Sequence, residues 1–170
     1  MNYLDTAFSQ LELSIKLMRA GEQGMLKRKS IDLPLTIAEK NSVLVLSDQT
    51  LLTDDDLISA LQNNVLITFG AAAITLNRCR EENGYPIPDP INTELEQWIA
   101  LVYQIRNAFA HDISEPTWVI NHRYARSYEI GYIKVDLTAL NGGRFNYNQL
   151  GGLEVLFLLK DFGKEYLFKA

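Results

Sequence analysis

Most hydrophobic positions of this chain recur at the spacing of an α-helix. Over residues 3–20, apolar side chains follow one another at three- and four-residue steps, which places them on one helical face. Comparable patterns predict helices over residues 53–82, 94–113 and 150–168. The four segments predict a mainly α protein, in which helices bury their apolar faces against one another.

Two other stretches carry the features of strands and turns. Residues 31–52 alternate apolar and polar positions around Pro34, which predicts an irregular segment or a short hairpin. Residues 118–147 are richer in aromatic and β-branched side chains and contain a strong turn signal, Asn141-Gly142-Gly143. There we expect strands at Trp118–Ile120, Tyr128–Leu137 and Phe145–Tyr147. The predicted fold is a bundle of about four helices with this small β element before the last helix, in one domain spanning residues 1–170.

Two helix starts are marked by capping residues. Thr93 is followed three residues later by Glu96, which is the capping-box pattern. Thr53 precedes Asp54-Asp55-Asp56, and acidic residues in a first turn suit the positive end of a helix dipole. Within the second predicted helix, Gly70-Ala71-Ala72-Ala73 forms a small-residue face where we expect another helix to approach closely.

Composition and charge exclude several classes of protein. The 170 residues include 16 basic and 21 acidic side chains, and the net charge of −5 argues against a protein that coats nucleic acid or anionic membrane. A single cysteine, Cys79, excludes an intramolecular disulfide. The longest apolar run, Val65–Leu76, is short of the ~20 residues that span a bilayer, and no signal peptide is recognisable. We therefore expect a cytoplasmic protein without a membrane partner, metal site or cofactor.

Arg106 interrupts the apolar face of the third predicted helix. That face comprises Leu95, Trp98, Ile99, Val102, Ile105 and Phe109. Arg106 lies four residues after Val102 and three before Phe109, hence within the apolar stripe. Because an arginine is almost never fully buried without a partner, its position needs a reason. Either the side chain reaches to the helix end or pairs with a core carboxylate, or the stripe borders a cleft or subunit interface where the cation meets an anion.

The residues from Arg106 onward read Arg106-Asn107-Ala108-Phe109-Ala110-His111-Asp112. This sequence resembles the Arg-x4–6-His motif of the HEPN superfamily, with the polar residue that the family favours directly after the arginine. HEPN domains are all-helical bundles and are generally dimeric. Many are metal-independent endoribonucleases, and others have become binding or regulatory modules. The resemblance implies a HEPN-like up-and-down bundle, to which the β element at about residues 118–147 is an addition. One toxin subgroup has a tyrosine two residues after the histidine, where this chain has Ile113.

The resemblance also assigns roles to the motif residues. The RNA 2′-OH would attack the adjacent phosphate and leave a 2′,3′-cyclic phosphate, with no metal or cofactor. His111 would transfer the proton, Arg106 would stabilise the phosphate charge, and Asn107 would orient one of them. Asp112 would orient the imidazole or end the helix. In a continuous helix Arg106 and His111 would point about 140° apart, so either the helix breaks near Ala110 or a second subunit brings its own motif opposite.

RNA recognition would require a local positive surface. Arginines and tyrosines are interleaved after residue 121, and Arg123, Arg126 and Tyr124 are the candidate RNA-binding residues, the tyrosine by stacking on a base. The polar faces of a half-buried hairpin would explain the same pattern.

The sequence leaves more than one function open. The first is a HEPN-type endoribonuclease, acting as a toxin or in defence. It would be a homodimer with a composite site, with RNA as its substrate and an antitoxin or regulatory protein as a further partner. The second is a non-catalytic HEPN-like module that binds a partner protein, nucleotide or RNA. A third is an unrelated helical protein in which the motif is accidental.

Overall fold

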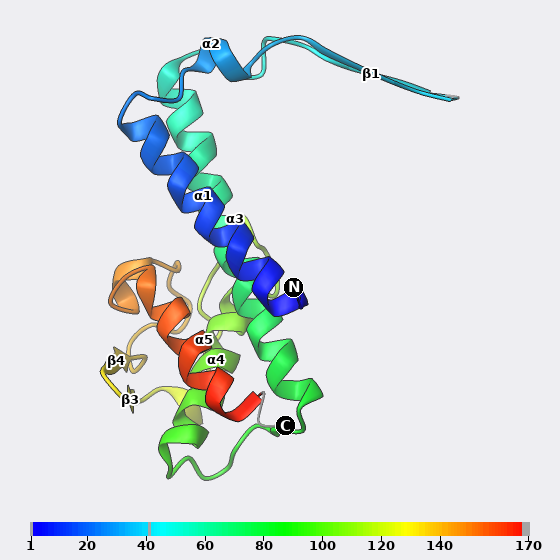
Figure 1. The fold of residues 1–170 in the computed structure, drawn as a ribbon. Helices are drawn as coiled ribbons and strands as arrows, with labels where there is room; N and C mark the ends of the chain where they lie inside the picture. The colour runs from blue at the N-terminus through cyan, green and yellow to red at the C-terminus, as the bar shows by residue number, and fades with distance from the viewer. Residues whose placement is uncertain (1, 41, 168–170) are drawn as a thin grey trace. The chain divides into compact units, whose positions relative to one another are not determined.

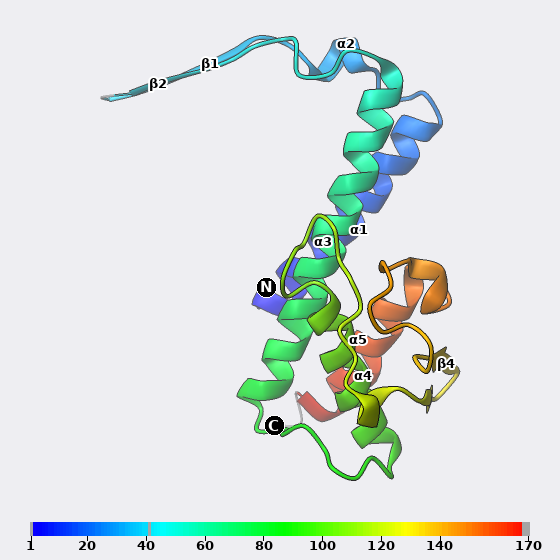
Figure 2. The same cartoon turned by 180° about the vertical axis from the view of Figure 1, so that it is seen from behind.

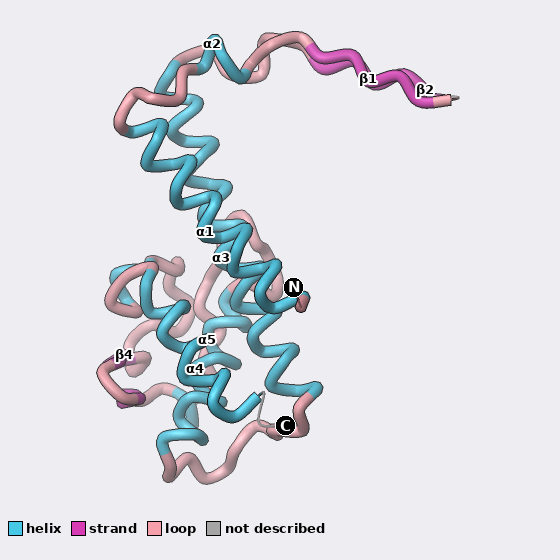
Figure 3. The backbone as a smooth tube through the Cα atoms, viewed as in Figure 1, coloured by secondary structure: helices cyan, strands magenta, loops and turns pink. Residues whose placement is uncertain are grey.

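A computed structural model describes residues 2–40 and 42–167 of the chain (Figure 1). The described helices are α1 (Tyr3–Glu22), α2 (Arg28–Ile31), α3 (Asp54–Glu82), α4 (Glu94–Ala108) and α5 (Glu154–Leu167). The described strands form two separate antiparallel hairpins, β1 (Leu35–Glu39) with β2 (Ser42–Leu46) and β3 (Ser127–Ile130) with β4 (Ile133–Asp136) (Figure 3). The mainly α character that the hydrophobic pattern predicts is therefore confirmed. The chain divides into two compact units, one of residues 10–65 and the other of the remaining residues.

The unit Gln10–Val65 holds the second part of α1, the short helix α2, the first hairpin and the beginning of α3. The hairpin predicted as one alternative for residues 31–52 is present, with Leu35 opposite Leu46 and Ile37 opposite Leu44. Thr53 caps α3 as predicted: its hydroxyl accepts the N–H of Asp56 at 3.1 Å. In return, the Asp56 carboxylate accepts the N–H of Thr53 at 2.7 Å.

The other unit contains the start of α1, the rest of α3, and helices α4 and α5 (Figure 2). Trp98 of α4 joins it to α5, because its indole N–H donates to the carbonyl of Leu159 at 2.8 Å. A side chain at Gly163 would collide with the Trp98 ring, so glycine lets α5 approach. The start of α1 packs on α5 through Phe8 and Phe157, whose ring centroids are 5.5 Å apart. These contacts bury the core of the helical body.

Helix α4 begins where the sequence predicts. The Thr93 hydroxyl accepts the N–H of Glu96 at 3.2 Å, and the Glu96 carboxylate accepts the N–H of Thr93 at 2.7 Å. Both halves of the capping box are therefore formed. The apolar stripe of the helix is buried from Trp98 onward, while Leu95 is half-buried. Ala100, Leu101, Gln104 and Ala108 are buried as well. Helix α4 is thus covered on most of its circumference rather than along one stripe.

Two predicted helix boundaries were wrong. Helix α4 ends at Ala108 rather than near residue 113. Helix α5 begins at Glu154 rather than at Leu150. Gly151 and Gly152 precede it with φ angles of 99° and 132°, a left-handed conformation that side-chain-bearing residues rarely adopt. The predicted last residue of this helix, Phe168, lies outside the described residues.

The β element between α4 and α5 differs in detail from the prediction. Residues 128–137 were expected as one strand, but they divide at Gly131, φ 55°, into the hairpin β3–β4. Residues 118–120 do not form a strand; instead the N–H of Trp118 donates to the carbonyl of Gly143 at 2.8 Å. The third expected strand was also wrong, because Tyr147 begins a 3₁₀ turn, Tyr147–Gln149. The turn at Asn141-Gly142-Gly143 is confirmed.

Helix α3 is long and apolar enough to cross a membrane by length and composition alone, and one third of its most apolar stretch is buried. Core helices of water-soluble proteins share this length and composition, so the cytoplasmic location stays a prediction. Cys79, near the end of α3, is buried as a small apolar residue would be, and burial raises the pKa of its thiol.

Candidate active site at the end of helix α4

The Arg-x4-His motif straddles the end of α4. The helix ends at Ala108, and Phe109 caps it with its N–H donating to the carbonyl of Arg106 at 3.1 Å. The N–H of Ala110 follows, donating to the carbonyl of Asn107 at 3.2 Å. Arg106 and Asn107 therefore lie in the last turn of the helix, while His111 lies in the chain beyond it. A helix break near Ala110 is one of the two arrangements that would allow Arg106 and His111 to act at one site.

Phe109 fixes the point at which the chain leaves the helix. Its ring is buried and lies 4.8 Å from that of Phe145 and 5.7 Å from that of Phe69, centroid to centroid. A side chain at Gly70 would overlap the Phe109 ring. The small-residue face predicted on α3 therefore receives an aromatic ring from the motif itself. Such aromatic packing stabilises the fold beyond the area that it buries.

The two polar residues of the last turn contact each other. Arg106 is half-buried, and its guanidinium donates to the side-chain carbonyl of Asn107 at 3.1 Å. Within residues 2–40 and 42–167, no carboxylate pairs with Arg106. The interpretation of Arg106 as half of a buried ion pair is therefore not supported, whereas its cation remains available to an anion from outside the chain.

His111 is exposed, and in the described part of the chain its imidazole has no hydrogen-bond partner. Neighbouring Asp112 does not orient it. The Asp112 carboxylate instead accepts the Ser114 hydroxyl at 2.7 Å, the Ser114 N–H at 2.8 Å and the Glu115 N–H at 3.0 Å. These bonds, that from the Ser114 side chain first, lower the pKa of the Asp112 carboxyl. Asp112 thus holds the turn that follows His111 rather than capping the helix, which ends four residues earlier.

The arrangement places a guanidinium, an amide and an imidazole in one six-residue segment. A hydrogen bond joins Arg106 to Asn107, but no hydrogen bond joins either of them to His111 in the described chain. The same residues contain no group of three or more His, Cys, Asp or Glu side chains able to hold a metal ion. The chemistry that this segment can supply is anion binding by Arg106 and proton transfer by His111.

Gln104 is a polar residue of α4 that the sequence reasoning missed. It is buried, and neither amide atom has a hydrogen-bond partner among the described residues. It lies three residues before Asn107, hence on the same helical face. The sequence did contain a signal for its burial, because Gln104 is uncharged and lies next to Ile105 and near Leu101. The sequence analysis assumed one buried stripe on this helix, and Gln104 lies outside that stripe.

The candidate RNA-binding residues lie around the 3₁₀ turn His122–Tyr124 and the start of β3. Tyr124 is 2% exposed, so its ring has no free face for a base, and the stacking role expected for it was wrong. Arg123 covers that ring with its guanidinium 4.6 Å from the centroid and also pairs with Asp89 at 2.9 Å. Arg126 is exposed and donates to the carbonyl of Ile91 at 3.1 Å.

Carboxylates neutralise most of the other cations of this segment. Lys134 pairs with Glu129 at 3.2 Å, and Arg144 pairs with Glu115 at 3.5 Å. Exposed pairs of this kind contribute little to stability, but they reduce the local positive potential. Arg126 is the cation of this group that has no carboxylate partner in the described chain.

Comparison of the chain with protein-family models, with curated proteins and with solved structures gave no match.

Proposed function

We propose that this protein is a metal-independent endoribonuclease of the HEPN type, with Arg106, Asn107 and His111 as its catalytic residues. The observation that carries the proposal is the end of α4 at Ala108. Because the helix ends between the arginine and the histidine, the two side chains are not held on diverging faces of one helix. The exposed imidazole supports the same assignment, as does the half-buried guanidinium, which pairs with no carboxylate among the described residues.

The reaction follows from the chemistry of these groups. His111 accepts the proton of the RNA 2′-OH, the 2′-oxygen forms a bond to phosphorus, and the bond from phosphorus to the 5′-oxygen breaks. Arg106 binds the phosphate and stabilises the charge that develops on its oxygens. Asn107 acts as a positioning residue, because its carbonyl already accepts from the Arg106 guanidinium. The products are a 2′,3′-cyclic phosphate and a 5′-hydroxyl.

A second copy of the chain completes the site in this proposal. The reaction needs one group to remove the 2′-OH proton and another to protonate the departing 5′-oxygen. The motif supplies one imidazole per chain, so a two-fold arrangement would provide the pair. We therefore propose a homodimer with a composite site, with an antitoxin or regulatory protein as its further partner.

The paired cations favour a second candidate, the non-catalytic HEPN-like module. Arg123, Lys134 and Arg144 each have a carboxylate partner, and the chain carries a net charge of −5. Around this segment and the end of α4, an RNA substrate would have to displace these pairs or rely on Arg106 and Arg126. A module that binds a partner protein or a single nucleotide would not need the wider positive surface.

Cleavage of RNA by the purified full-length protein in EDTA tests the proposal. The variant is His111→Ala, and the matched control is His122→Ala, which removes the chain's other histidine from an exposed position. We expect wild type and His122→Ala to produce 2′,3′-cyclic phosphate ends, and His111→Ala to lose cleavage at least about a hundredfold. Absence of cleavage by a folded wild-type dimer, or equal cleavage by His111→Ala, would reject the enzyme and favour the binding module.

A further inference from the structure

The first hairpin exposes apolar side chains on both of its faces. We call residues 33–46 the arm; it contains β1 and β2 and lies within the unit Gln10–Val65. Figures 1 and 3 show it leaving α2 and extending away from the adjoining ends of α1 and α3. Large apolar residues of the arm are 43–67% exposed, namely Leu33, Leu35, Ile37, Val43, Leu44, Val45 and Leu46. Exposed apolar surface of this density marks an interaction site.

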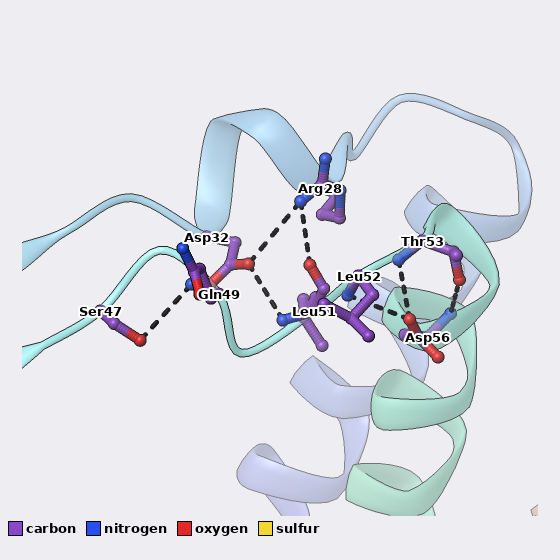
Figure 4. A network of polar contacts seen from close by, with 8 residues as sticks. All are labelled: Arg28, Asp32, Ser47, Gln49, Leu51, Leu52, Thr53 and Asp56. Atoms are coloured by element: carbon purple, nitrogen blue, oxygen red, sulfur yellow. Dashed lines mark hydrogen bonds and ion pairs between the residues drawn. The ribbon is translucent and has the colours of Figure 1, made fainter.

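The base of the arm is fastened by polar contacts (Figure 4). The Arg28 guanidinium donates to the carbonyl of Leu51 at 2.9 Å and lies 3.9 Å from the Asp32 carboxylate. The Leu51 N–H donates to that same carboxylate at 3.0 Å. Asp32 precedes β1 and Leu51 follows β2, so the contacts hold together the two segments that enter and leave the arm. These contacts therefore fix the base of the arm, although the residues of the arm itself are exposed.

The register divides the arm into two apolar faces. Leu35, Ile37, Leu44 and Leu46 share one face, because opposed residues of an antiparallel pair point to the same side. Val43 and Val45 share the other with Thr36 and Ala38. Both strands also have an open edge, since the sheet has two strands. A two-stranded hairpin is marginally stable in water by itself, which favours an arm that is covered by a partner.

The charge of the arm indicates which kind of partner can bind it. Glu39 and Lys40 are the charged residues of the arm, and they cancel. Nucleic acid would find one cation there, and a bilayer would have to accept the charged tip and two unpaired strand edges. A second arm meets no like-charge repulsion. Its β2 strand is also self-complementary in an antiparallel pair, with Leu44 opposite Leu44 and Val43 opposite Val45.

The rest of the described surface contains no comparable apolar segment. Outside residues 25–52, the large exposed apolar residues of the described chain are far apart in the sequence: Tyr3, Leu13, Ile67, Val119, Tyr132 and Leu158. On a second copy of this chain, the described segment with a comparable density of exposed apolar side chains is therefore the arm itself. We propose that the arm is a dimerisation element, in which β2 of one chain pairs edge to edge with β2 of a second copy, so that the two leucine faces join side by side in one four-stranded sheet.

The test compares two equivalent leucine substitutions in the full-length chain. Leu44 on the arm is 52% exposed and Leu158 on α5 is 47% exposed, so Leu44→Lys and Leu158→Lys introduce the same charge at similar exposure. We expect wild type and Leu158→Lys to sediment as dimers at micromolar concentration. We expect Leu44→Lys to raise the dimer dissociation constant about tenfold or more, because two-fold pairing places two lysines together. Far-ultraviolet circular dichroism should be unchanged, since Leu44 contributes nothing to the helices.

A cysteine cross-link gives a second measurement. Leu44→Cys should form a disulfide-linked dimer under mild oxidation, whereas Leu158→Cys should not. The chain's own cysteine, Cys79, is buried, so it should contribute little background cross-linking. A monomeric wild type, a dimer unaffected by Leu44→Lys, or arm-dependent binding to lipid vesicles by a monomer would each overturn the proposal. None of these readouts uses RNA cleavage. A monomeric wild type would contradict both the arm and the composite homodimer of the proposed function. A dimer that is unaffected by Leu44→Lys would contradict the arm alone, and a dimer that does not cleave RNA would contradict the ribonuclease alone.

Discussion

Arg106 and Phe109 are three residues apart in the motif, and their surroundings predict opposite effects on stability. Arg106 is half-buried and contacts Asn107, with no carboxylate to leave unpaired in the described chain. We expect Arg106→Ala to change the free energy of unfolding by less than about 1 kcal/mol. Removing one partner of a buried ion pair would instead cost about 3–5 kcal/mol. Urea denaturation followed by circular dichroism measures the difference.

Phe109→Ala is the matched comparison in the same segment. It removes a ring that lies among Phe69, Phe145 and the backbone of Gly70, so a loss of about 3–5 kcal/mol is expected. If both variants lost the same stability, Arg106 would have a structural role that its contacts do not show. If both were neutral, the buried aromatic cluster would not anchor the end of α4.

At single positions, the sequence could predict departures from a pattern but not local turns. Arg106 stood out because it interrupts an apolar stripe, and it is half-buried with no carboxylate partner in the part of the chain that the structure describes. Tyr124 was misplaced because a 3₁₀ turn, His122–Tyr124, directs its ring inward against Tyr103 at 5.9 Å. A three-residue turn has no periodicity to detect. The burial of Gln104 was missed because packing from several sides cannot be read from one helical stripe.

The start of α4 depends on a local element that can be tested directly. Thr93→Ala removes the hydroxyl that accepts the Glu96 N–H, and replacing a helix-capping threonine typically costs about 1 kcal/mol. Thr117→Ala is the control, because its hydroxyl lies 3.5 Å from the carbonyl of Glu115 and caps no helix. Thermal or urea unfolding should rank Thr93→Ala below Thr117→Ala. Equal stability would mean that tertiary packing alone fixes the start of α4.

Starts and ends of elements differ in how far the sequence determines them. The starts of α3 and α4 were predicted, since Thr53 and Thr93 cap through contacts three residues away. The end of α4 was not, because the apolar spacing continues beyond Ala108 while the tertiary packing of Phe109 ends the helix. Likewise, residues 128–137 have the composition of one strand, and the positive φ of Gly131 divides them. Tertiary contacts decided these boundaries, and local pattern carries little information about them.

For the whole molecule, hydrogen-bonded carboxylates predict a loss of stability in acid. Asp56, Glu96 and Asp112 accept N–H or O–H donors, which lower their pKa values below the ordinary 3.8 of Asp and 4.5 of Glu. A carboxyl whose pKa is lower in the folded chain stabilises it above the unfolded pKa, and that contribution is lost as pH falls through the folded value. Melting temperatures should therefore be level above about pH 5 and fall between about pH 4 and pH 2.

At alkaline pH, folding stability should fall as the pH rises, which is the opposite of the acid side, and the cause is different. Burial raises the pKa of Tyr128 and Tyr147 to about 12 from the ordinary 10. A group whose pKa is raised on folding stabilises the folded chain below its unfolded pKa, so stability should decline as pH rises from about 10 toward 12. Tyr147→Phe should reduce that decline without loss at neutral pH, because the Tyr147 hydroxyl is buried with no hydrogen-bond partner in the described chain. Tyr132→Phe, at a fully exposed ring, should leave the profile unchanged. A decline of the same size in Tyr147→Phe would show that this hydroxyl ionises in the folded protein as readily as in the unfolded chain.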